Sequence, residues 1–140
     1  MRGIKIIYLI VSFIFLNKNA FSQTEKCDTI YSNPDSLTVF EGGNKNLMEL
    51  VLNELIPIIH LKCSNEIDLP SSLKIRFTIN SFGEVIDLKM IRPNPDVYSE
   101  FCLNEIYTKA KTLKGFKSAS NNGIPVCSYY FLPISCIKWD

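Results

Sequence analysis

The sequence contains a single histidine, His60, and no Cys-x-x-Cys pair. A zinc ribbon, a thioredoxin-like site and covalent haem attachment all need such a pair, and a metal site on His60 and Cys63 would need two further ligands. No phosphate-binding loop is present, because Gly42-Gly43 precedes a predicted helix without the required lysine and spacing. We therefore expect no cofactor and no metal.

Evidence for catalysis is equally sparse. His60-Leu61-Lys62-Cys63 could place a base near a nucleophile. No third group to orient the imidazole and no oxyanion-hole motif accompany it, so a loop histidine beside a structural cysteine is the stronger interpretation. Glu84 and Asp87 lie near a predicted hairpin and are interpreted as solvated charges. The sequence predicts a protein that is not an enzyme.

An excess of charge of one sign is also missing. The chain has 15 basic and 14 acidic residues. Without residues 1–22 it loses three basic residues, Arg2, Lys5 and Lys18, and keeps 12 basic and 14 acidic ones, a formal charge of −2. Such a domain has no basic field for nucleic acid or an anionic membrane, and we exclude both as partners.

No apolar run is long enough for an ordinary membrane span. Ile6–Leu16 covers about half of the ~20 residues that a transmembrane helix needs. Basic residues precede this run and small residues follow it, which is typical of a signal peptide over residues 1–22, cleaved after Ser22. We expect an exported protein, periplasmic or extracellular; the alternative is an inner-membrane anchor formed by residues 4–16.

Five cysteines remain after cleavage, and an odd number leaves at least one thiol outside any bridge within the chain. Export places them where disulfides form, each contributing about 2–4 kcal/mol. Cys27 and Cys63, in connecting segments, are candidate partners. Cys102 is expected to be buried on a helix face, free or bridged to a sheet neighbour. Cys127 and Cys136 are nine residues apart on one predicted strand, on opposite faces, which disfavours a bridge between them.

Length and composition fit one domain, residues 39–140, after a leader segment, residues 23–38, with a short extended stretch near Leu37–Phe40. Apolar spacing predicts a helix over Asn44–Ile56, ended by Pro57, and then a connection over 58–70. Strict alternation predicts an antiparallel pair of strands at Leu73–Asn80 and Val85–Arg92, joined by a turn at Gly83.

A second helical pattern covers Asp96–Leu113, and a loop over 117–123 follows it. Pro125–Trp139 is β-branched and aromatic and predicts a third strand, at an edge or bulged at Pro133. The predicted fold is α+β, with two helices packed on a three-stranded antiparallel sheet in the order helix-strand-strand-helix-strand.

Three motifs resemble the C-terminal domain family of TonB, over about Val39–Trp139. Phe40-Glu41-Gly42-Gly43 is similar to the family's F-P-G-G opening, and Ile75–Val85 is similar to its V-x-F-x-V-x-x-x-G-x-V hairpin. The most specific motif is Asn122-Gly123-Ile124-Pro125-Val126, which with Tyr129–Ile134 resembles the family's N-G-x-P-V and x-x-P-I-x-F endings. The family's W-x-P is altered here, where Phe116 and Ser118 stand instead.

The resemblance implies binding of an extended peptide, such as a segment of a TonB-dependent outer-membrane transporter, by strand addition. An edge strand offers unpaired backbone N–H and C=O groups to such a partner. The expected edge comprises Val126, Cys127, Ser128, Tyr129, Tyr130 and Phe131. Two alternatives remain open: a homodimer of a secreted, disulfide-stabilised structural protein through the same edge, and an edge with a purely structural role.

Overall fold

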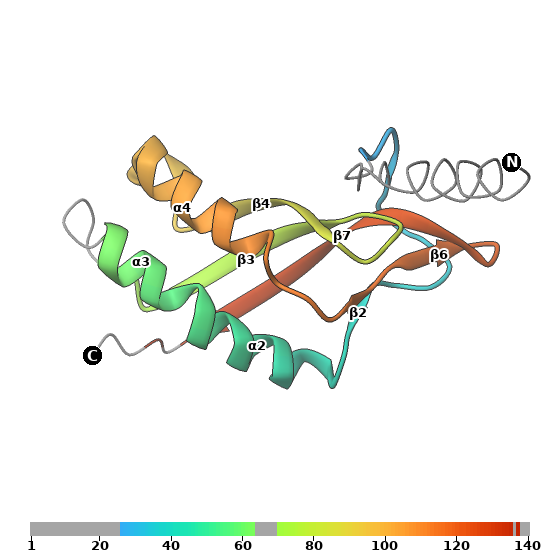
Figure 1. The fold of residues 1–140 in the computed structure, drawn as a ribbon, viewed down its shortest axis with the longest axis horizontal. Coiled ribbons are helices and arrows are strands. Elements are labelled where there is room, and N and C mark those ends of the chain that lie inside the picture. Colours follow the sequence, from blue (N-terminus) through green and yellow to red (C-terminus); the bar gives the residue numbers. More distant parts are fainter. Residues whose placement is uncertain (1–25, 64–69, 136, 138–140) are drawn as a thin grey trace, which may run out of the picture.

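The structure, a computed structural model, describes residues 26–63, 70–135 and 137. The predicted signal peptide, the alternative anchor over residues 4–16 and Cys136 lie outside these residues. The fold is α+β, with helices over one face of a curved sheet and the shorter strands gathered toward the end away from α3 (Ile56–Cys63) (Figure 1). None of the described helices is long and apolar enough to cross a bilayer.

Two central strands follow the predicted alternation. β3 (Ser72–Ile79) and β4 (Val85–Arg92) form an antiparallel pair. One face of β3 is fully buried, whereas Lys74 between the buried residues is exposed. Burial of one face of a sheet stabilises its register, because a slip of one residue would turn every side chain to the other face.

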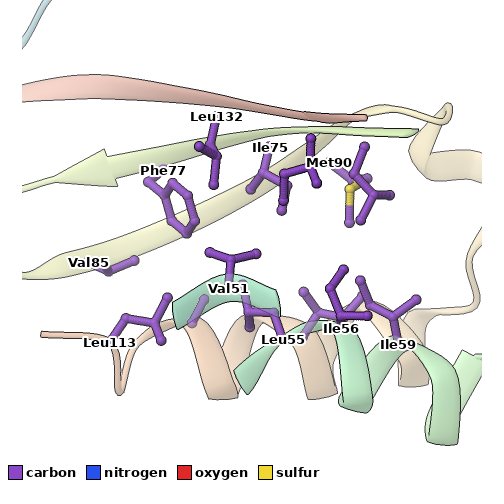
Figure 2. Packing of buried hydrophobic residues seen from close by; sticks show 14 of the residues in the cluster. Val51, Leu55, Ile56, Ile59, Ile75, Phe77, Val85, Met90, Leu113 and Leu132 are labelled. Carbon is purple, nitrogen blue, oxygen red and sulfur yellow. The ribbon is translucent and has the colours of Figure 1, made fainter. Parts of the chain in front are cut away.

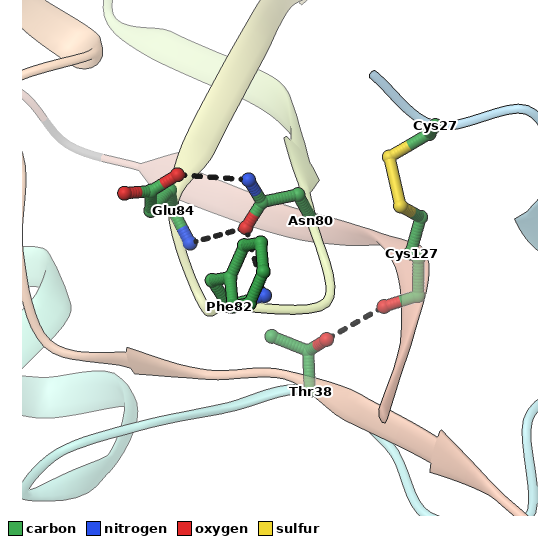
Figure 3. The surroundings of a disulfide bond; sticks show 7 residues. Cys27, Thr38, Asn80, Phe82, Glu84 and Cys127 are labelled. Atoms are coloured by element: carbon green, nitrogen blue, oxygen red, sulfur yellow. Dashed lines mark hydrogen bonds between the residues drawn. A yellow bond between two sulfur atoms is a disulfide. The ribbon is translucent and has the colours of Figure 1, made fainter. Parts of the chain in front are cut away.

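A buried asparagine shapes the turn between these strands. The side-chain oxygen of Asn80 accepts hydrogen bonds from the amides of Phe82 and Glu84, at 3.0 and 2.9 Å, and its NH₂ group donates to the Glu84 carboxylate at 2.9 Å (Figure 3). Gly83 follows with φ of +79°, and a Cβ atom there would lie 2.3 Å from the carbonyl oxygen of Phe116. Both the backbone conformation and this close approach require glycine.

The third long strand is β7 (Ile124–Ser135), and the sheet order is β1-β7-β3-β4. β1 (Ile30–Tyr31) runs parallel to β7, and β6 (Ala119–Asn121) pairs with β7 antiparallel. β2 (Val39–Phe40) and β5 (Phe116–Lys117) form a separate two-stranded sheet. The predicted three-stranded antiparallel sheet is therefore wrong in strand number and direction, because strands of two or three residues are too short to show a period.

The first helical region is longer than predicted. α2 (Gly43–Glu54) corresponds to the predicted helix over Asn44–Ile56 and ends before Pro57, but after Leu55 a second helix, α3, follows it. Pro57 is the second residue of α3, where a helix has no intrahelical partner for an N–H group and tolerates proline. The predicted connection over 58–70 is helical as far as Cys63.

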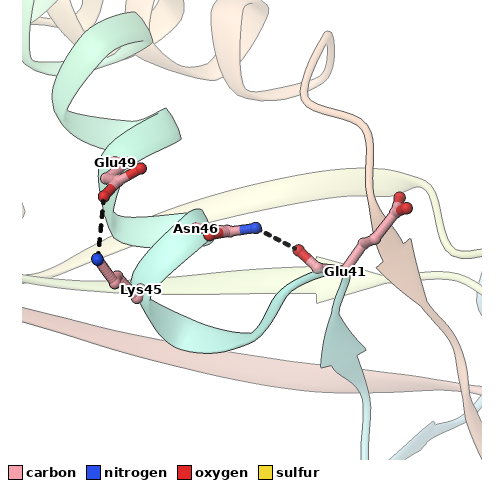
Figure 4. A network of polar contacts seen from close by, with 4 residues as sticks. All are labelled: Glu41, Lys45, Asn46 and Glu49. Carbon is pink, nitrogen blue, oxygen red and sulfur yellow. Dashed lines mark hydrogen bonds and ion pairs between the residues drawn. The ribbon is translucent and has the colours of Figure 1, made fainter.

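The start of α2 is a polar turn. Gly42 has φ of +79°, and a Cβ atom there would meet the side chain of Asn46 at 1.7 Å. The Asn46 amide donates to the Glu41 carbonyl at 3.5 Å, and Lys45 and Glu49 form an ion pair at 4.0 Å (Figure 4). Because Lys45 and Glu49 are largely exposed, this pair contributes little to stability.

The second helical region is shorter than Asp96–Leu113. A 3₁₀ turn (Pro95–Val97) precedes α4 (Glu100–Ala110), and the hydroxyl of Ser99 accepts a hydrogen bond from the Cys102 amide at 3.1 Å. This side chain caps the helix and fixes its start. The buried face, with Cys102, Ile106 and Ala110, is the predicted one. The loop expected over 117–123 instead includes the end of β5 and all of β6.

The core lies between the helices and the sheet. Figure 2 shows side chains of β3, β4 and β7 pointing toward those of α2 and α3. Full burial of each large aliphatic or aromatic side chain contributes about 1.5–3 kcal/mol. Members with 1% exposure or less include Val51, Leu55, Ile59, Ile75, Phe77 and Met90.

Two disulfides cross-link the described residues. Cys27 is bonded to Cys127 and Cys63 to Cys102, with Cα–Cα distances of 5.9 and 5.5 Å. The predicted partnership of Cys27 with Cys63 is wrong, and Cys102 is bridged to a helix rather than to a sheet neighbour. Cys127 is not bridged to Cys136, as predicted. Two disulfides indicate an oxidising compartment and hence export.

Candidate peptide-binding edge

β7 uses its two sides differently. Along one side Ser128–Ser135 pairs with β3 in a continuous register that Pro133 does not interrupt. β6 pairs with residues 124–126 beyond the end of β3, and on the side opposite β3, β1 pairs with Cys127 and Ser128. Among the described residues no strand pairs with the outer side of Tyr129–Ser135. This stretch, which we call the open edge, is the exposed ladder of the sheet on that side.

The turn after β3 shows which backbone groups face the open edge. The Asn80 amide donates to the Glu84 carbonyl at 3.0 Å, so Asn80 turns its backbone toward β4. Backbone direction alternates along an antiparallel ladder, so Phe77 faces β7 and its register partner Tyr130 faces β3. The residues that point outward are then Tyr129, Phe131, Pro133 and Ser135.

Pro133 agrees with this alternation, because proline has no N–H to give to β3 and is found where a strand borders solvent. Phe131 and Ser135 each offer an N–H and a C=O to the open edge, whereas Pro133 offers only a C=O. Tyr129 also offers only its C=O, because the parallel register of Tyr31 with Ser128 directs the Tyr129 N–H to β1.

Half of the edge predicted from sequence is already occupied. Val126 pairs with Ala119, Cys127 carries a disulfide, and Ser128 is buried with its hydroxyl 2.6 Å from that of Thr38 (Figure 3). Tyr129, Tyr130 and Phe131 remain on the open edge, which continues beyond them to Ser135.

Tyr130 belongs to the fold more than to the edge. Its ring lies 5.5 Å from that of Phe116, and its hydroxyl donates to the side chain of Asn44 at the start of α2. Burial raises the pKa of this hydroxyl. Phe116, which stands where the resembled family has tryptophan, also packs on Phe40 with ring centroids 4.9 Å apart. These contacts hold β5 and α2 beside β7.

Tyr129 and Phe131 lie on the opposite face of the sheet, with cations above them. The guanidinium carbon of Arg76 is 4.3 Å from the centre of the Tyr129 ring, and Lys74 Nζ is 5.7 Å from that of Phe131. Phe131 is 50% exposed. The face beside the open edge is therefore aromatic and positively charged.

A hollow of about 430 Å³ lies along the open edge. Its walls are Tyr129–Phe131 on one side and Ser32, Leu37 and Thr38 on the other. Leu37 is 67% exposed and gives this wall an apolar element. Sequence reasoning missed the wall, because residues 23–38 were interpreted as a leader; their described part carries β1 and a bridge between Ser36 and Ser120.

The alternative chemistry at His60 and Cys63 loses its nucleophile. His60 lies on α3, not in a loop, and Cys63 is buried and bonded to Cys102. A bridged sulfur has no thiolate with which to attack. Within the described residues no group of three or more histidine, cysteine or acidic side chains is placed to hold a metal ion.

Comparison of the chain with family models, with curated proteins and with solved structures gives no match in any of the three.

Proposed function

We propose that this protein is an exported, TonB C-terminal-like binding module that takes up an extended peptide by strand addition along the open edge. The observation that carries the proposal is the unpaired outer side of Tyr129–Ser135 beside the hollow. A guest of about seven residues matches the length of this stretch. Each backbone hydrogen bond to the guest contributes about 0.5–1.5 kcal/mol.

The side chains around the open edge favour a guest with alternating character. On the face that carries Tyr129 and Phe131, Lys74 and Arg76 attract acidic side chains. The hollow, with exposed Leu37 in its wall, suits apolar side chains. The resemblance to the TonB family supports an outer-membrane transporter as the source of the guest peptide. It also supports export of this protein by a signal peptide and its location in the periplasm.

Amide hydrogen exchange tests the proposal at single residues. Free protein should exchange the amides of Phe131 and Ser135 quickly and those of Tyr130 and Leu132 slowly, because the latter face β3. A seven-residue peptide of alternating acidic and apolar residues should slow the first group alone. The control peptide carries N-methyl groups on the backbone nitrogens that would face β7. Binding of both peptides with equal affinity would show that the main chain is not the recognition element.

A second candidate function is homodimerisation of a secreted, disulfide-stabilised structural protein through the same edge. The half-exposed ring of Phe131 beside unpaired backbone favours it. Sedimentation distinguishes the two functions: a dimer at micromolar concentration whose edge amides are already protected supports self-pairing, whereas a monomer with fast edge amides supports a foreign guest.

A further inference from the structure

A second hollow of about 430 Å³ shares Tyr129 with the hollow at the open edge. It brings together the N-terminal segment, the outer face of the sheet and the end of α4. Its polar lining consists of Lys26, Arg76, Thr78, Asp87, Tyr107, Lys111 and Tyr129, and its apolar lining includes Ile30 and Ile86. We call it the cationic pocket.

The charges of this pocket are unbalanced. Lys26, Arg76 and Lys111 face one acid, Asp87, and none of the four forms an ion pair with another described residue. Three cations in one small concavity repel one another unless an anion lies between them. The imbalance is local, since the chain without residues 1–22 has a formal charge of −2.

Arg76 supplies a donor without an acceptor. Its Nε atom is buried and has no hydrogen-bond partner among the residues that the structure describes, although buried polar groups are nearly always paired. The guanidinium carbon of Arg76 lies 4.3 Å from the centre of the Tyr129 ring, which favours one position of the group beside the pocket. A guanidinium fork matches the two oxygens of a carboxylate.

The end of α4 contributes the same combination of ring and cation. Lys111 Nζ lies 5.0 Å from the centre of the Tyr107 ring, and the Tyr107 hydroxyl donates to the Ile86 carbonyl at 2.9 Å. The Tyr107 ring is thereby held in place, and it joins Ile30, Ile86 and Tyr129 in giving the pocket apolar surface. The volume suits a small organic molecule.

We propose that the cationic pocket binds a small aromatic carboxylate, with its acid group at Arg76 and Lys111 and its ring against Tyr107, Tyr129 and the two isoleucines. The pocket uses side chains on the face of the sheet rather than the backbone of the open edge. It therefore constitutes a second binding function, beyond that of peptide uptake.

Titration of the disulfide-bonded protein followed by NMR tests the proposal, with benzoate as the probe. Benzoate should shift the amide signals of Arg76, Ile86 and Lys111 and should bind about tenfold more tightly than either benzamide or acetate, which lack the charge and the ring respectively. Arg76→Gln and Lys111→Gln should each weaken benzoate binding about tenfold. Lys45→Gln, an exposed cation of α2, is the matched control and should leave binding unchanged.

The conservative variant Arg76→Lys keeps the charge but loses the planar fork, so its affinity should fall between those of the wild type and Arg76→Gln. Dispersed amide signals in each variant show that the fold is kept. Three results would overturn the proposal: benzamide binding as tightly as benzoate, unchanged benzoate binding in both Gln variants, or no shifts up to about 10 mM benzoate.

Discussion

Cys27 is bonded to Cys127, one hundred residues further along the chain, and this bond fastens β1 to the beginning of β7. The bridge thereby covers the backbone of Cys127 and Ser128, next to the open edge, and its first cysteine also lines the cationic pocket. One covalent link therefore borders both candidate sites.

Replacement of this bridge by the double variant Cys27→Ser/Cys127→Ser should lower the free energy of unfolding by about 3 kcal/mol, because it releases a constraint on a long loop of the unfolded chain. Detachment of β1 should also speed amide exchange at residues 127 and 129, which face β1, measured by NMR. Cys63→Ser/Cys102→Ser is the control: it should destabilise by a similar amount and leave exchange at β1 and the start of β7 unchanged. Equal effects of both variants on those amides would contradict the prediction.

Gly83→Ala should lower the free energy of unfolding by more than 2 kcal/mol, on the order of the cost of a left-handed residue plus a displaced backbone contact. Its new Cβ atom would meet the Phe116 carbonyl oxygen at 2.3 Å. Gly123→Ala is a matched control, since Gly123 has φ of +76° with nothing within 4 Å of the added atom. It should cost about 1 kcal/mol. Denaturant unfolding measures the free energy of unfolding of both variants. Equal decreases would show that the close approach to Phe116 adds no cost at Gly83.

Tyr98→Phe should raise the free energy of unfolding by about 1 kcal/mol, because it removes a buried hydroxyl that has no hydrogen-bond partner among the described residues. Urea unfolding of the two proteins near pH 7 measures the difference. A loss of stability would instead indicate that a water molecule satisfies this hydroxyl.

The same residue should make stability depend on pH in alkaline solution. Burial raises the pKa of Tyr98 from 10.0 to about 12. As pH rises, the unfolded state therefore loses the phenolic proton first. The free energy of unfolding is unaffected by this group below about pH 10 and declines as pH rises toward 12. The free energy of unfolding, measured across this pH interval, should fall less steeply in Tyr98→Phe than in the wild type. Identical slopes would show that Tyr98 does not titrate differently in the two states.

Phe131→Pro should weaken peptide binding about fivefold, because it removes an N–H group that faces the open edge. Phe131→Leu is the control, since it removes the ring but keeps the donor, and it should bind the peptide more tightly than the proline variant. Fluorescence anisotropy with a labelled peptide measures both. Both variants should remain folded, as thermal unfolding curves would show. Asn80 turns its backbone toward β4, and from this alternation residue 131 gives no backbone hydrogen bond to β3.

The sequence predicted the parts of the fold in which a periodic pattern meets one buried face. Leu73, Ile75 and Phe77 alternate with polar residues and are buried, as expected. Pro57 misled the helix prediction, because proline ends a helix in its interior but is tolerated in its first turn, and sequence alone does not show that a new helix begins at Ile56.

The short strands and the disulfides were beyond sequence reasoning for another reason. β1 is only two residues long, and nothing local reveals that Ile30 lies beside Cys127. Cysteine pairing is set by tertiary proximity, so Cys27 and Cys63 were assigned to each other although their partners are Cys127 and Cys102. The outer side of β7 is open further toward the C-terminus than the sequence indicated, because β1 pairs with Cys127 and Ser128.

Pro133 has a protective consequence, because no described strand pairs with the outer side of Tyr129–Ser135. Unpaired sheet edges can pair with further copies of the same chain and grow into fibrils, and natural proteins interrupt such edges with proline and lysine. Here Pro133 removes one N–H donor from the open edge, and Lys74 is its register partner on β3. Both features should therefore resist amyloid-like extension of the open edge by further copies of the chain.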